Sequence, residues 1–420
     1  MSVSAAQQPS GIKADDTVVT VILAASFGHF LNDMMQSLLP AIYPMLQKNY
    51  SLAFWQIGVL TFAYQITASI LQPLVGIYTD RKPLPYSLSF GMGCTLVGLV
   101  LLATAHHYWL LLAGACCVGF GSSVFHPEAS RVARLASGGK HGFAQSLFQV
   151  GGNFGTSIGP LLAAFVVLPF GQISVSWFSV AALIGMIVLW RVGNWYNRYR
   201  VANASKPKPD KTLPLPRDKV IKTVFVLMLL IFAKYIYLVS ITSYYTFYTE
   251  RHFGVSTRTS ELLLFLFLAA VAAGTILGGP IGDRIGSRKV IWMSILGILP
   301  FTLVLPYASL EVTAVLSVII GFVLASAFPA IVVFAQELLP GRVGMVSGLF
   351  FGFAFGMGGT AAAALGVVAD AYGIEFVYKI CSFMPLLGLL AIFLPKLEKT
   401  RKAKRSEEHT SELQSHLNLV

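Results

Sequence analysis

The stretch Gly279-Pro280-Ile281-Gly282-Asp283-Arg284-Ile285-Gly286-Ser287-Arg288-Lys289 follows a long apolar run, and a related stretch occurs earlier in the chain. The earlier copy, Gly76-Ile77-Tyr78-Thr79-Asp80-Arg81-Lys82, places its aspartate 203 residues before Asp283. Further matches keep an offset of 202: Phe125-His126-Pro127 with Ala327-Phe328-Pro329, and Leu147-Phe148 with Leu349-Phe350. Several matches in register over this length indicate a duplicated unit.

The composition is typical of a chain that lies in a lipid bilayer. Of its 420 residues, 55% are hydrophobic and 11% are charged, and the mean hydropathy is +0.71. Soluble domains are about 25% charged, so the chain lacks the polar surface that water requires. Its apolar runs are continuous rather than alternating, which argues against a transmembrane barrel. The composition also excludes a disordered chain, a collagen and a coiled coil.

Twelve apolar runs of about 20 residues predict twelve transmembrane helices. The expected spans are 18–46, 53–79, 84–105, 108–134, 143–168, 173–194, 220–248, 259–281, 289–308, 311–338, 345–369 and 375–395. Together with the duplication, they predict an all-α polytopic membrane protein built as two pseudo-symmetric six-helix bundles. Two such repeats facing each other across a central site are the usual architecture of secondary transporters.

The distribution of positive charge predicts the orientation of the chain. Loops on one side hold 25 of the 30 lysines and arginines, and the opposite side holds only Lys48, Arg251 and Arg258. Positive loops face the cytoplasm, so both termini are expected there. The net charge of +12 then reflects topology, and no nucleic-acid partner is expected.

The same pattern divides the chain into five parts. We expect a cytoplasmic tail over 1–17, one six-helix bundle over 18–194, a basic proline-rich linker over 195–219, a second bundle over 220–395 and a cytoplasmic tail over 396–420. From about residue 406 the tail, SEEHTSELQSHLNLV, breaks in composition from the rest and has the character of translated cloning sequence. It is excluded from the functional argument as non-native.

Asp33 is the first candidate for proton coupling, because a carboxylate within a membrane span is costly unless it serves a cavity or a partner. His29, Asp33 and Gln36 share one face of the first span by their spacing. We expect His29 to take part in proton coupling, and Asp33 and Gln36 to contact the substrate. The alternative is a hydrogen-bond cluster that holds helices together.

Lys234 lies within the seventh span, at the position equivalent to Asn32 at the offset of 202. It is expected to bind an anionic substrate or to neutralise Asp33, and a fixed ion pair is the alternative. Tyr237 and Tyr244 follow on roughly the same side of the span and are further candidates for substrate contact. An aromatic stripe of this kind also occurs as simple packing or interface anchoring.

His126 and Glu128 flank Pro127 in the fourth span and are candidates for proton coupling. Arg131 lies three residues beyond Glu128, can pair with it, and is a candidate substrate contact. The alternative is a set of charges at a helix end that only sets topology. In the fifth span, Gln149 and Asn153 fall on one face, and they either line a hydrated path or bond across helices.

Two groups of residues are candidates for gating. Asp80, Arg81, Asp283, Arg284 and Arg288 lie at helix ends, where they are expected to form an ion-pair and helix-dipole latch. Gly155, Gly159 and Pro160 are expected to form a packing seam between the halves, since small residues four apart let helices approach closely. Gly344, Gly348 and Gly352 suggest the same seam in the corresponding helix. Static packing is the alternative.

The duplicated G-x-x-x-D-R-x-G-x-R-K loop resembles the signature of the major facilitator superfamily. The first copy departs from it, with Pro83-Leu84-Pro85 where a glycine is expected. Within that superfamily, the stretches His29–Ser37, Phe125–Glu128 and Gln336–Arg342 are similar to the bacterial fosmidomycin-resistance family, and Gly155-x-x-x-Gly159-Pro160 resembles a motif of its proton-coupled exporters. The resemblance covers roughly residues 18–395.

This resemblance implies a monomeric proton-coupled antiporter in the bacterial inner membrane. It would export a small anionic phosphonate drug, fosmidomycin, by alternating access, using the proton gradient and no cofactor or metal. An importer of a small anion or sugar on the same fold is the alternative. A membrane-embedded enzyme using His126 and Glu128 is a more distant one. The chain has no G-x-x-x-x-G-K-[ST] loop, which argues against ATP hydrolysis.

Overall fold

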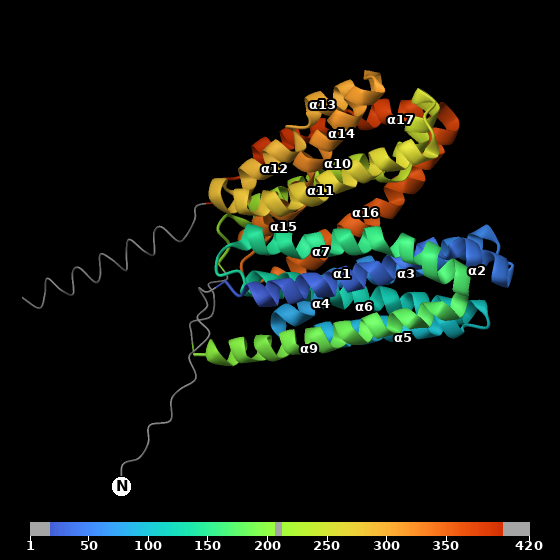
Figure 1. Cartoon of the computed structure of the whole chain (residues 1–420). Helices are drawn as coiled ribbons and strands as arrows, with labels where there is room; N and C mark the ends of the chain where they lie inside the picture. The colour runs from blue at the N-terminus through green and yellow to red at the C-terminus, as the bar shows by residue number, and fades with distance from the viewer. Residues whose placement is uncertain (1–16, 206–211, 398–420) are drawn as a thin grey trace, which may run out of the picture.

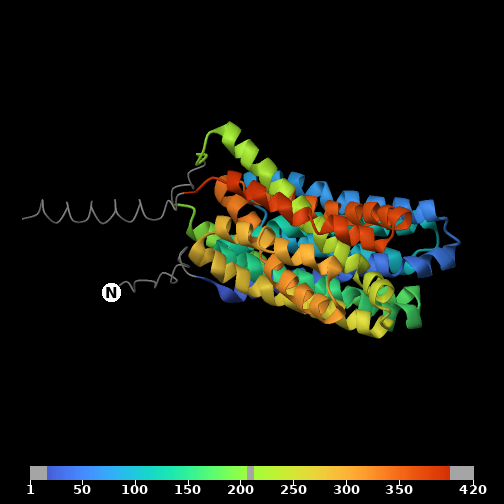
Figure 2. The same ribbon diagram turned by 90° about the horizontal axis from the view of Figure 1, so that it is seen from above.

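The protein is helical throughout the part of the chain that the structure, a computed structural model, describes: residues 17–205 and 212–397. The helices run along a common long axis and form two bundles (Figures 1 and 2). The expected N-terminal tail up to residue 16, the non-native tail from about 406 and part of the expected linker lie outside the described residues.

The N-terminal half is the blue-to-green bundle of Figure 1. It consists of α1 (Val19–Ala41), α2 (Tyr43–Tyr50), α3 (Phe54–Ser69), α4 (Leu71–Arg81), α5 (Ser87–Thr104), α6 (Tyr108–Leu135), α7 (His141–Leu162), a π-helical turn (Ala163–Val167), α8 (Leu168–Phe170), a 3-10 segment (Gln172–Trp177) and α9 (Phe178–Ala202).

The C-terminal half repeats this plan. It consists of α10 (Arg217–Phe253), α11 (Thr257–Ile285), α12 (Ser287–Ile295), α13 (Leu299–Val304), a 3-10 turn (Leu305–Tyr307), α14 (Leu310–Ala325), α15 (Ala327–Leu338), α16 (Val343–Tyr372), α17 (Ile374–Cys381) and a final 3-10 segment (Met384–Phe393). Because α9 continues to Ala202 and α10 begins at Arg217, residues 195–202 and 217–219 of the expected linker are helical.

Eleven helical stretches among the described residues are long and apolar enough to cross a membrane. The first helix, α1, is not one of these eleven, although it has 23 residues and packs inside the bundle against α6, α7 and α9. Polar residues interrupt its apolar sequence, and five of them are buried: Ser26, His29, Asn32, Asp33 and Gln36. The expected span that is missing from these eleven is therefore the first one, and it carries the polar face.

The outer surface is apolar, as a bilayer requires. Phe165, Trp109 and Phe393 are each more than 70% exposed, whereas charged residues such as Glu128 and Arg131 are buried. In water this pattern is unfavourable, but in lipid the exposed rings meet acyl chains and the charges meet one another. The structure thus has the form of a multi-pass membrane protein.

Proline explains why several expected spans appear as two shorter helices. Helices α3 and α14 end at Ser69 and Ala325, four residues before Pro73 and Pro329. Proline has no N–H to donate to the carbonyl four residues earlier, and its ring collides with that carbonyl. The chain nevertheless continues in the same direction, so α3 with α4, and α14 with α15, each cross the membrane as one broken span.

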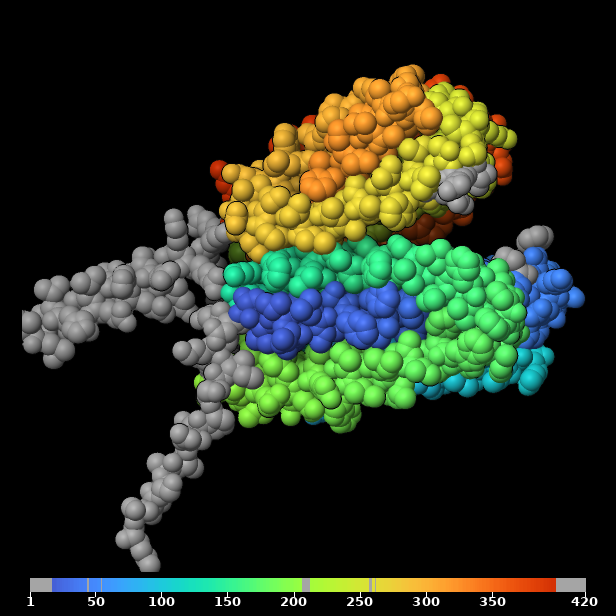
Figure 3. Space-filling model, viewed as in Figure 1, coloured from blue at the N-terminus to red at the C-terminus, as the bar shows by residue number. Residues whose placement is uncertain are grey.

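The two halves meet along two related helix pairs, α4 with α16 and α7 with α11. Figure 3 shows the halves in contact at the end of the molecule where α9 ends and α10 begins, and apart at the other end. We call these the linker end and the open end.

The glycine seam lies elsewhere than the sequence predicts. A Cβ atom at Gly155 or Gly159 of α7 would collide with the backbone of Phe30 or Met34 in α1, so these glycines pack inside the N-terminal half. In α16, by contrast, Gly348 lies against α4 and Gly352 against the end of α3, and hence both lie between the halves. At the offset of 202, Gly155 of α7 corresponds to position 357 of α16, whereas the nearest glycine of the four-residue series in α16 is Gly356. The glycine series of α7 and α16 are therefore shifted by one residue, and a shift of one residue turns a side chain by about 100° around the helix.

Substituting alanine for Gly155 is expected to destabilise the protein. The added Cβ collides with the Phe30 carbonyl oxygen and lies 2.9 Å from the Met34 nitrogen, so α1 and α7 have to separate. Such overpacking costs about 1–3 kcal/mol. Thermal unfolding in detergent would show a lowered Tm. Gly356→Ala in α16 is the matched control, because a Cβ there meets nothing within 4 Å. Equal Tm values for both variants would contradict the seam.

Candidate functional site

The centre of the N-terminal half holds a buried cluster of Asp33, His29 and His126, hereafter the carboxylate–histidine cluster. The Nε2 atom of His29 lies 3.2 Å from Asp33 Oδ2, and Nε2 of His126 lies 3.2 Å from Asp33 Oδ1. Both histidines are fully buried and Asp33 is 5% exposed. The structure therefore joins Asp33 and His29, which sequence reasoning placed on one face of the first span, to His126 of the fourth span, a separate candidate for proton coupling.

Local structure sets this geometry. His29 and Asp33 are one turn apart on α1, and His126 comes from α6, immediately before Pro127. The Nδ1 atom of His29 donates to the Phe148 carbonyl at 2.8 Å, and Nδ1 of His126 lies 3.0 Å from the Ser122 carbonyl. Gly152 of α7 makes room for the cluster, because a Cβ there would strike the His29 ring.

Neutral polar groups complete the surroundings of Asp33. Asn32 Nδ2 donates to Asp33 Oδ1 at 3.0 Å, and Gln36 Nε2 approaches the same oxygen at 3.4 Å. The Tyr64 hydroxyl on α3 donates to Gln36 Oε1 at 2.9 Å. Gln36 was predicted as a substrate contact, and here it supports the carboxylate. The roles of Asn32 and Tyr64 were missed, although Asn32 lies on the polar side of α1.

Aromatic rings from the C-terminal half cover the cluster. Phe351 and Phe355 of α16 have ring centroids 5.3 and 4.8 Å from that of His126. Phe351 in turn contacts Phe328 of α15 at 4.9 Å. The cluster therefore lies at the contact between the halves. Sequence reasoning missed these rings, although at the offset of 202 Phe328 is the counterpart of His126.

Lys234 lies on the other side of this aromatic layer. Its Nζ atom is 5.2 Å from the Phe328 ring centroid and 4.7 Å from that of Tyr235. The residue is 6% exposed, and among the described residues no carboxylate forms an ion pair with it. In this conformation Lys234 and Asp33 thus do not form an ion pair. A buried ammonium group with only ring faces beside it is poorly compensated, so it is suited to receive an anion.

The remaining predicted substrate contacts have partners within the helix bundle. Gln149 Nε2 donates to Asn153 Oδ1 at 3.1 Å, and Asn153 approaches Thr275 of α11 at 3.5 Å. This places the pair between the halves. Tyr237 belongs to the apolar core of the C-terminal half, and the Tyr244 hydroxyl donates to the Ala362 carbonyl at 2.6 Å. The two tyrosines therefore pack within that half.

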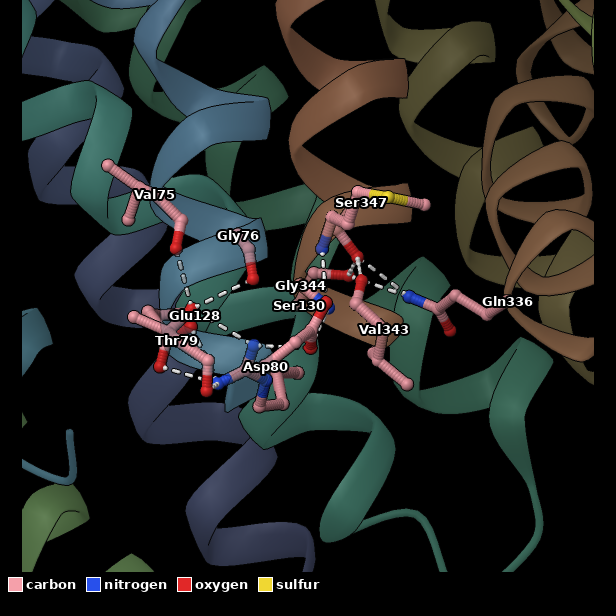
Figure 4. A network of polar contacts seen from close by, with 12 residues as sticks. Val75, Gly76, Thr79, Asp80, Glu128, Ser130, Gln336, Val343, Gly344 and Ser347 are labelled. Atoms are coloured by element: carbon pink, nitrogen blue, oxygen red, sulfur yellow. Dashed lines mark hydrogen bonds and ion pairs between the residues drawn. The ribbon is translucent and has the colours of Figure 1, made fainter. Parts of the chain in front are cut away.

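Glu128 and Arg131 belong to a second buried network near the linker end. Arg131 Nη1 lies 2.9 Å from Glu128 Oε1, and Nη2 lies 2.6 Å from Asp80 Oδ1. The same guanidinium donates to the carbonyl and hydroxyl oxygens of Thr79. Figure 4 shows this network from close by, with Glu128, Thr79 and Asp80 beside one another. The contacts place both residues with the latch, whereas sequence reasoning assigned them to proton coupling and substrate binding.

Asp80 and Asp283 each cap a helix of the opposite half. Asp80 accepts from the backbone N–H groups of Gly344 and Met345, at 2.9 and 2.8 Å, in the first turn of α16. Asp283 accepts from Gly142 and Phe143, at 2.8 and 2.9 Å, in the first turn of α7. A carboxylate at this position satisfies otherwise unpaired donors and the positive end of the helix dipole. The two caps therefore join the halves at the linker end.

The basic residues of the predicted latch lie differently. Arg81 and Arg284 are exposed, and Arg288 donates to the Ile392 carbonyl at 3.3 Å. The arginine that contacts Asp80 is instead Arg131 of α6. Sequence reasoning chose arginines adjacent to the aspartates, but adjacent side chains on a helix point in different directions.

A third tie between the halves is made of neutral groups. Gln336 Nε2 of α15 donates to Ser130 Oγ of α6 at 3.2 Å and to Ser347 Oγ of α16 at 2.9 Å, and Ser347 donates to Ser130 at 3.0 Å. Arg134 of α6 donates to Gln336 Oε1 at 3.0 Å. Figure 4 shows Ser130, Ser347 and Gln336 side by side. This tie has no equivalent in the duplicated loops, so it adds a contact that the repeat does not predict.

Two apolar grooves, of about 570 and 750 Å³, lie on the outside of the N-terminal half. Phe90 and Phe120 line both of them, and their other lining side chains are mainly aliphatic or aromatic. In a bilayer such grooves face acyl chains. They offer no cation to an anionic ligand, so the candidate site remains the region between the carboxylate–histidine cluster and Lys234.

Two bundles related by duplication, with capped helix ends on one side and buried ionisable groups between them, define a membrane transporter. The chain belongs to the Major Facilitator Superfamily, whose family model matches residues 25–349 and 223–418. It is 60% identical to the fosmidomycin resistance protein of Escherichia coli K12 over 375 residues, which is 89% of this chain and 92% of that protein.

A second relative, the uncharacterized MFS-type transporter YfnC of Bacillus subtilis, is 39% identical and covers 93% of this chain and 96% of its own. The fold also matches the solved structure of FucP from E. coli, a transporter of this superfamily in the outward conformation. That match has a TM-score of 0.68 at 17% identity, over 91% of this chain and 100% of FucP. The relatives are transporters, so the enzyme alternative is wrong.

Replacing Asp80 by asparagine is expected to open the linker end more than replacing Asp283 does. Both changes remove a helix cap, worth about 0.5–2 kcal/mol, but only Asp80 also balances the buried Arg131. Spin labels at the exposed positions Lys82 and Arg342, in a background without the four native cysteines, would report the distance between the halves.

A population of longer distances is expected in Asp80→Asn and a smaller one in Asp283→Asn. Asp370→Asn, at an exposed position of α16, is the control and should leave the distances unchanged. An unaltered distance distribution in Asp80→Asn would show that the cap does not hold the halves together.

Proposed function

We propose that this protein is a proton-driven antiporter of the bacterial inner membrane that exports fosmidomycin and similar small phosphonates. The observation that carries the proposal is the separation of charge at the site. A carboxylate–histidine cluster lies in one half, and an unpaired ammonium group lies in the other, beyond Phe351 and Phe328. The 60% identity to the E. coli fosmidomycin resistance protein supports the choice of substrate.

The proposed binding mode uses both sides of the aromatic layer. The Lys234 ammonium group, which has three N–H donors, would bind the phosphonate oxygens by charge-assisted hydrogen bonds. The phenyl rings of Phe328 and Phe351 would contact the apolar chain of the drug. The low dielectric of the bilayer interior strengthens the ammonium–phosphonate contact relative to water.

Exchange requires that protons and drug replace each other. After the cluster has lost its protons, lone pairs of Asp33, His29 and His126 need new donors. A phosphonate that keeps one acidic hydrogen carries a P–OH group that can supply such a donor. Protons and drug then compete for the same lone pairs, and each half-cycle carries one of them.

Alternating access would result if the halves separated at the linker end and came together at the open end. We assign the linker end to the cytoplasm, because the loops there hold most of the lysines and arginines. The conformation described here is closed at that end by Asp80, Asp283 and Gln336, and so would face outward. Loss of these ties would admit drug from the cytoplasm. One chain contains both halves of the site, so a monomer suffices.

Charge alone favours a second function. A protonated cluster is more positive than a deprotonated one, so it attracts an anion toward Lys234, and protons and anion then enter together. That coupling would make the protein an importer of a small anion. The two functions differ in the direction of drug flux under a pH gradient, which the following experiment measures.

In inside-out vesicles with an acidic lumen, fosmidomycin is expected to accumulate in the lumen and to leave it when ammonium chloride removes the gradient. Asp33→Asn is expected to lower gradient-driven uptake more than tenfold, because an amide does not exchange protons. Asp370→Asn, which removes an exposed carboxylate of α16, is the matched control and should transport normally. Gradient-driven uptake that survives Asp33→Asn would contradict the proposal, and accumulation only with an alkaline lumen would favour the importer.

Lys234→Gln is expected to raise the apparent KM for fosmidomycin about tenfold or more, the equivalent of losing one charge-assisted hydrogen bond of about 1.5–3 kcal/mol. Lys234→Arg should lie between Lys234→Gln and the unmodified protein. Lys379→Gln is the matched control, since Lys379 also lies over an aromatic ring, that of Tyr307 at 5.8 Å, but is exposed. Initial rates across a range of drug concentrations would show the effect, and an unchanged KM would refute anion binding by Lys234.

A further inference from the structure

The hydrogen bonds of the two cluster histidines fix the position of one proton on each ring. His29 Nδ1 lies 2.8 Å from the Phe148 carbonyl oxygen, and His126 Nδ1 lies 3.0 Å from the Ser122 carbonyl oxygen. A carbonyl oxygen only accepts, so both Nδ1 atoms carry hydrogen. The Ser122 hydroxyl, 3.2 Å from His126 Nδ1, can use its own lone pair there and does not alter this assignment.

The second nitrogen of each ring then faces Asp33. In a neutral imidazole that donates from Nδ1, Nε2 has a lone pair and no hydrogen. Each Nε2 lies 3.2 Å from a different carboxylate oxygen, and apart from Asp33 neither Nε2 has a hydrogen-bond partner among the described residues. A lone pair facing a carboxylate oxygen at this distance is repulsive. Each of the two contacts therefore needs one proton between its nitrogen and its oxygen.

From these hydrogen bonds we infer that the carboxylate–histidine cluster binds two protons in the outward-facing conformation and releases both in each transport cycle. The inference rests on the proposed function and adds its coupling ratio. With two protons, the cluster is an aspartate between two imidazolium rings and carries one net positive charge. When both protons leave to water, the cluster keeps one net negative charge on Asp33.

The surroundings are consistent with a charge that changes by two. Protonated rings of His29 and His126 would lie against aromatic faces, with Phe148 stacked on His29 at 4.1 Å and Phe351 and Phe355 beside His126. Aromatic faces attract cations. The other titratable groups near the cluster are Tyr64 of α3, which contacts it through Gln36, and Tyr235 and Lys234 of α10, which lie beyond Phe328. From α7 and α16, Phe148 and Phe351 contact the cluster, and among the described residues Asp33 is the one carboxylate that pairs with these histidines.

A divalent cation is the alternative source of two positive charges, since the three side chains offer ligand atoms within 4.8 Å of one another. The environment of Asp33 favours protons. Its Oδ1 atom already accepts from Asn32 and Gln36, so only Oδ2 has no neutral donor and could serve a metal ion as a single ligand. The test below keeps the metal as a separate outcome.

The coupling ratio can be measured as the drug gradient at which net flux stops. In proteoliposomes with the membrane potential held at zero by potassium and valinomycin, one pH unit supports a tenfold drug ratio for each proton exchanged. With two protons exchanged, the unmodified protein is expected to maintain a drug concentration ratio of roughly 100-fold at one pH unit. His126→Gln and His29→Gln are each expected to reach roughly tenfold, because the glutamine amide can donate to Asp33 without titrating. His106→Gln, at an exposed loop histidine, should remain at 100-fold.

The outcomes separate this inference from the proposed function. A tenfold ratio in the unmodified protein, or a 100-fold ratio that both cluster variants keep, would overturn the two-proton cluster while leaving antiport intact. No pH-driven drug gradient at all would overturn the proposed function. Transport that EDTA abolishes and Zn²⁺ restores would assign the cluster to a metal. Thermal unfolding in detergent, with a Tm in both variants close to that of the unmodified protein, would show that the variants are folded.

Discussion

The bilayer interior contains no water to solvate a charge, and this constraint organises the structure. A charge in that environment has to meet a partner or a ligand. Asp33 meets two histidines, and Arg131 meets both Glu128 and Asp80. Lys234 is the exception among these buried charges, since no carboxylate of the described residues pairs with it and its ammonium group lies over the rings of Tyr235 and Phe328. An uncompensated cation of this kind is the feature that an anionic substrate would complete.

The same constraint explains which polar contacts join the halves beside the apolar core that they share. In lipid, close backbone approach and hydrogen bonds take the place of hydrophobic association. Glycines at the start of α7 and α16 allow that approach, and Asp80 and Asp283 satisfy helix donors that would otherwise be unpaired. Helix α6 connects this latch to the cluster, because His126 and Arg131 are five residues apart, about 7.5 Å along its axis. A shift of α6 would therefore move both.

The duplication is symmetric at the latch and asymmetric at the site. Asp80 and Asp283 perform the same task in opposite halves, as their shared motif suggests. At the centre, the counterparts differ in chemistry: Asn32 with Lys234, and His126 with Phe328. The N-terminal half thus holds the carboxylate and the histidines that we propose to exchange protons, and the C-terminal half holds the cation and the rings of Phe328 and Phe351. A repeat can diverge in this way because the latch needs only backbone donors, whereas the site depends on side chains.

The sequence alone determined the class of the fold, the spans and the candidate residues. The length of the apolar runs and the basic loops reflect the thickness and sidedness of the bilayer, and both can be read from the sequence. The repeat can be found by comparing the sequence with itself. The sequence also singled out Asp33, His29, His126 and Lys234, because charges in apolar runs are conspicuous. Only the tertiary structure decided which residues they contact. It joined Asp33 to His126, 93 residues away, placed Arg131 in the latch and turned the Gly155 seam toward α1. These contacts depend on how each helix is rotated and on what packs against it, and a rotation of one residue, about 100°, changes every partner on a helix face.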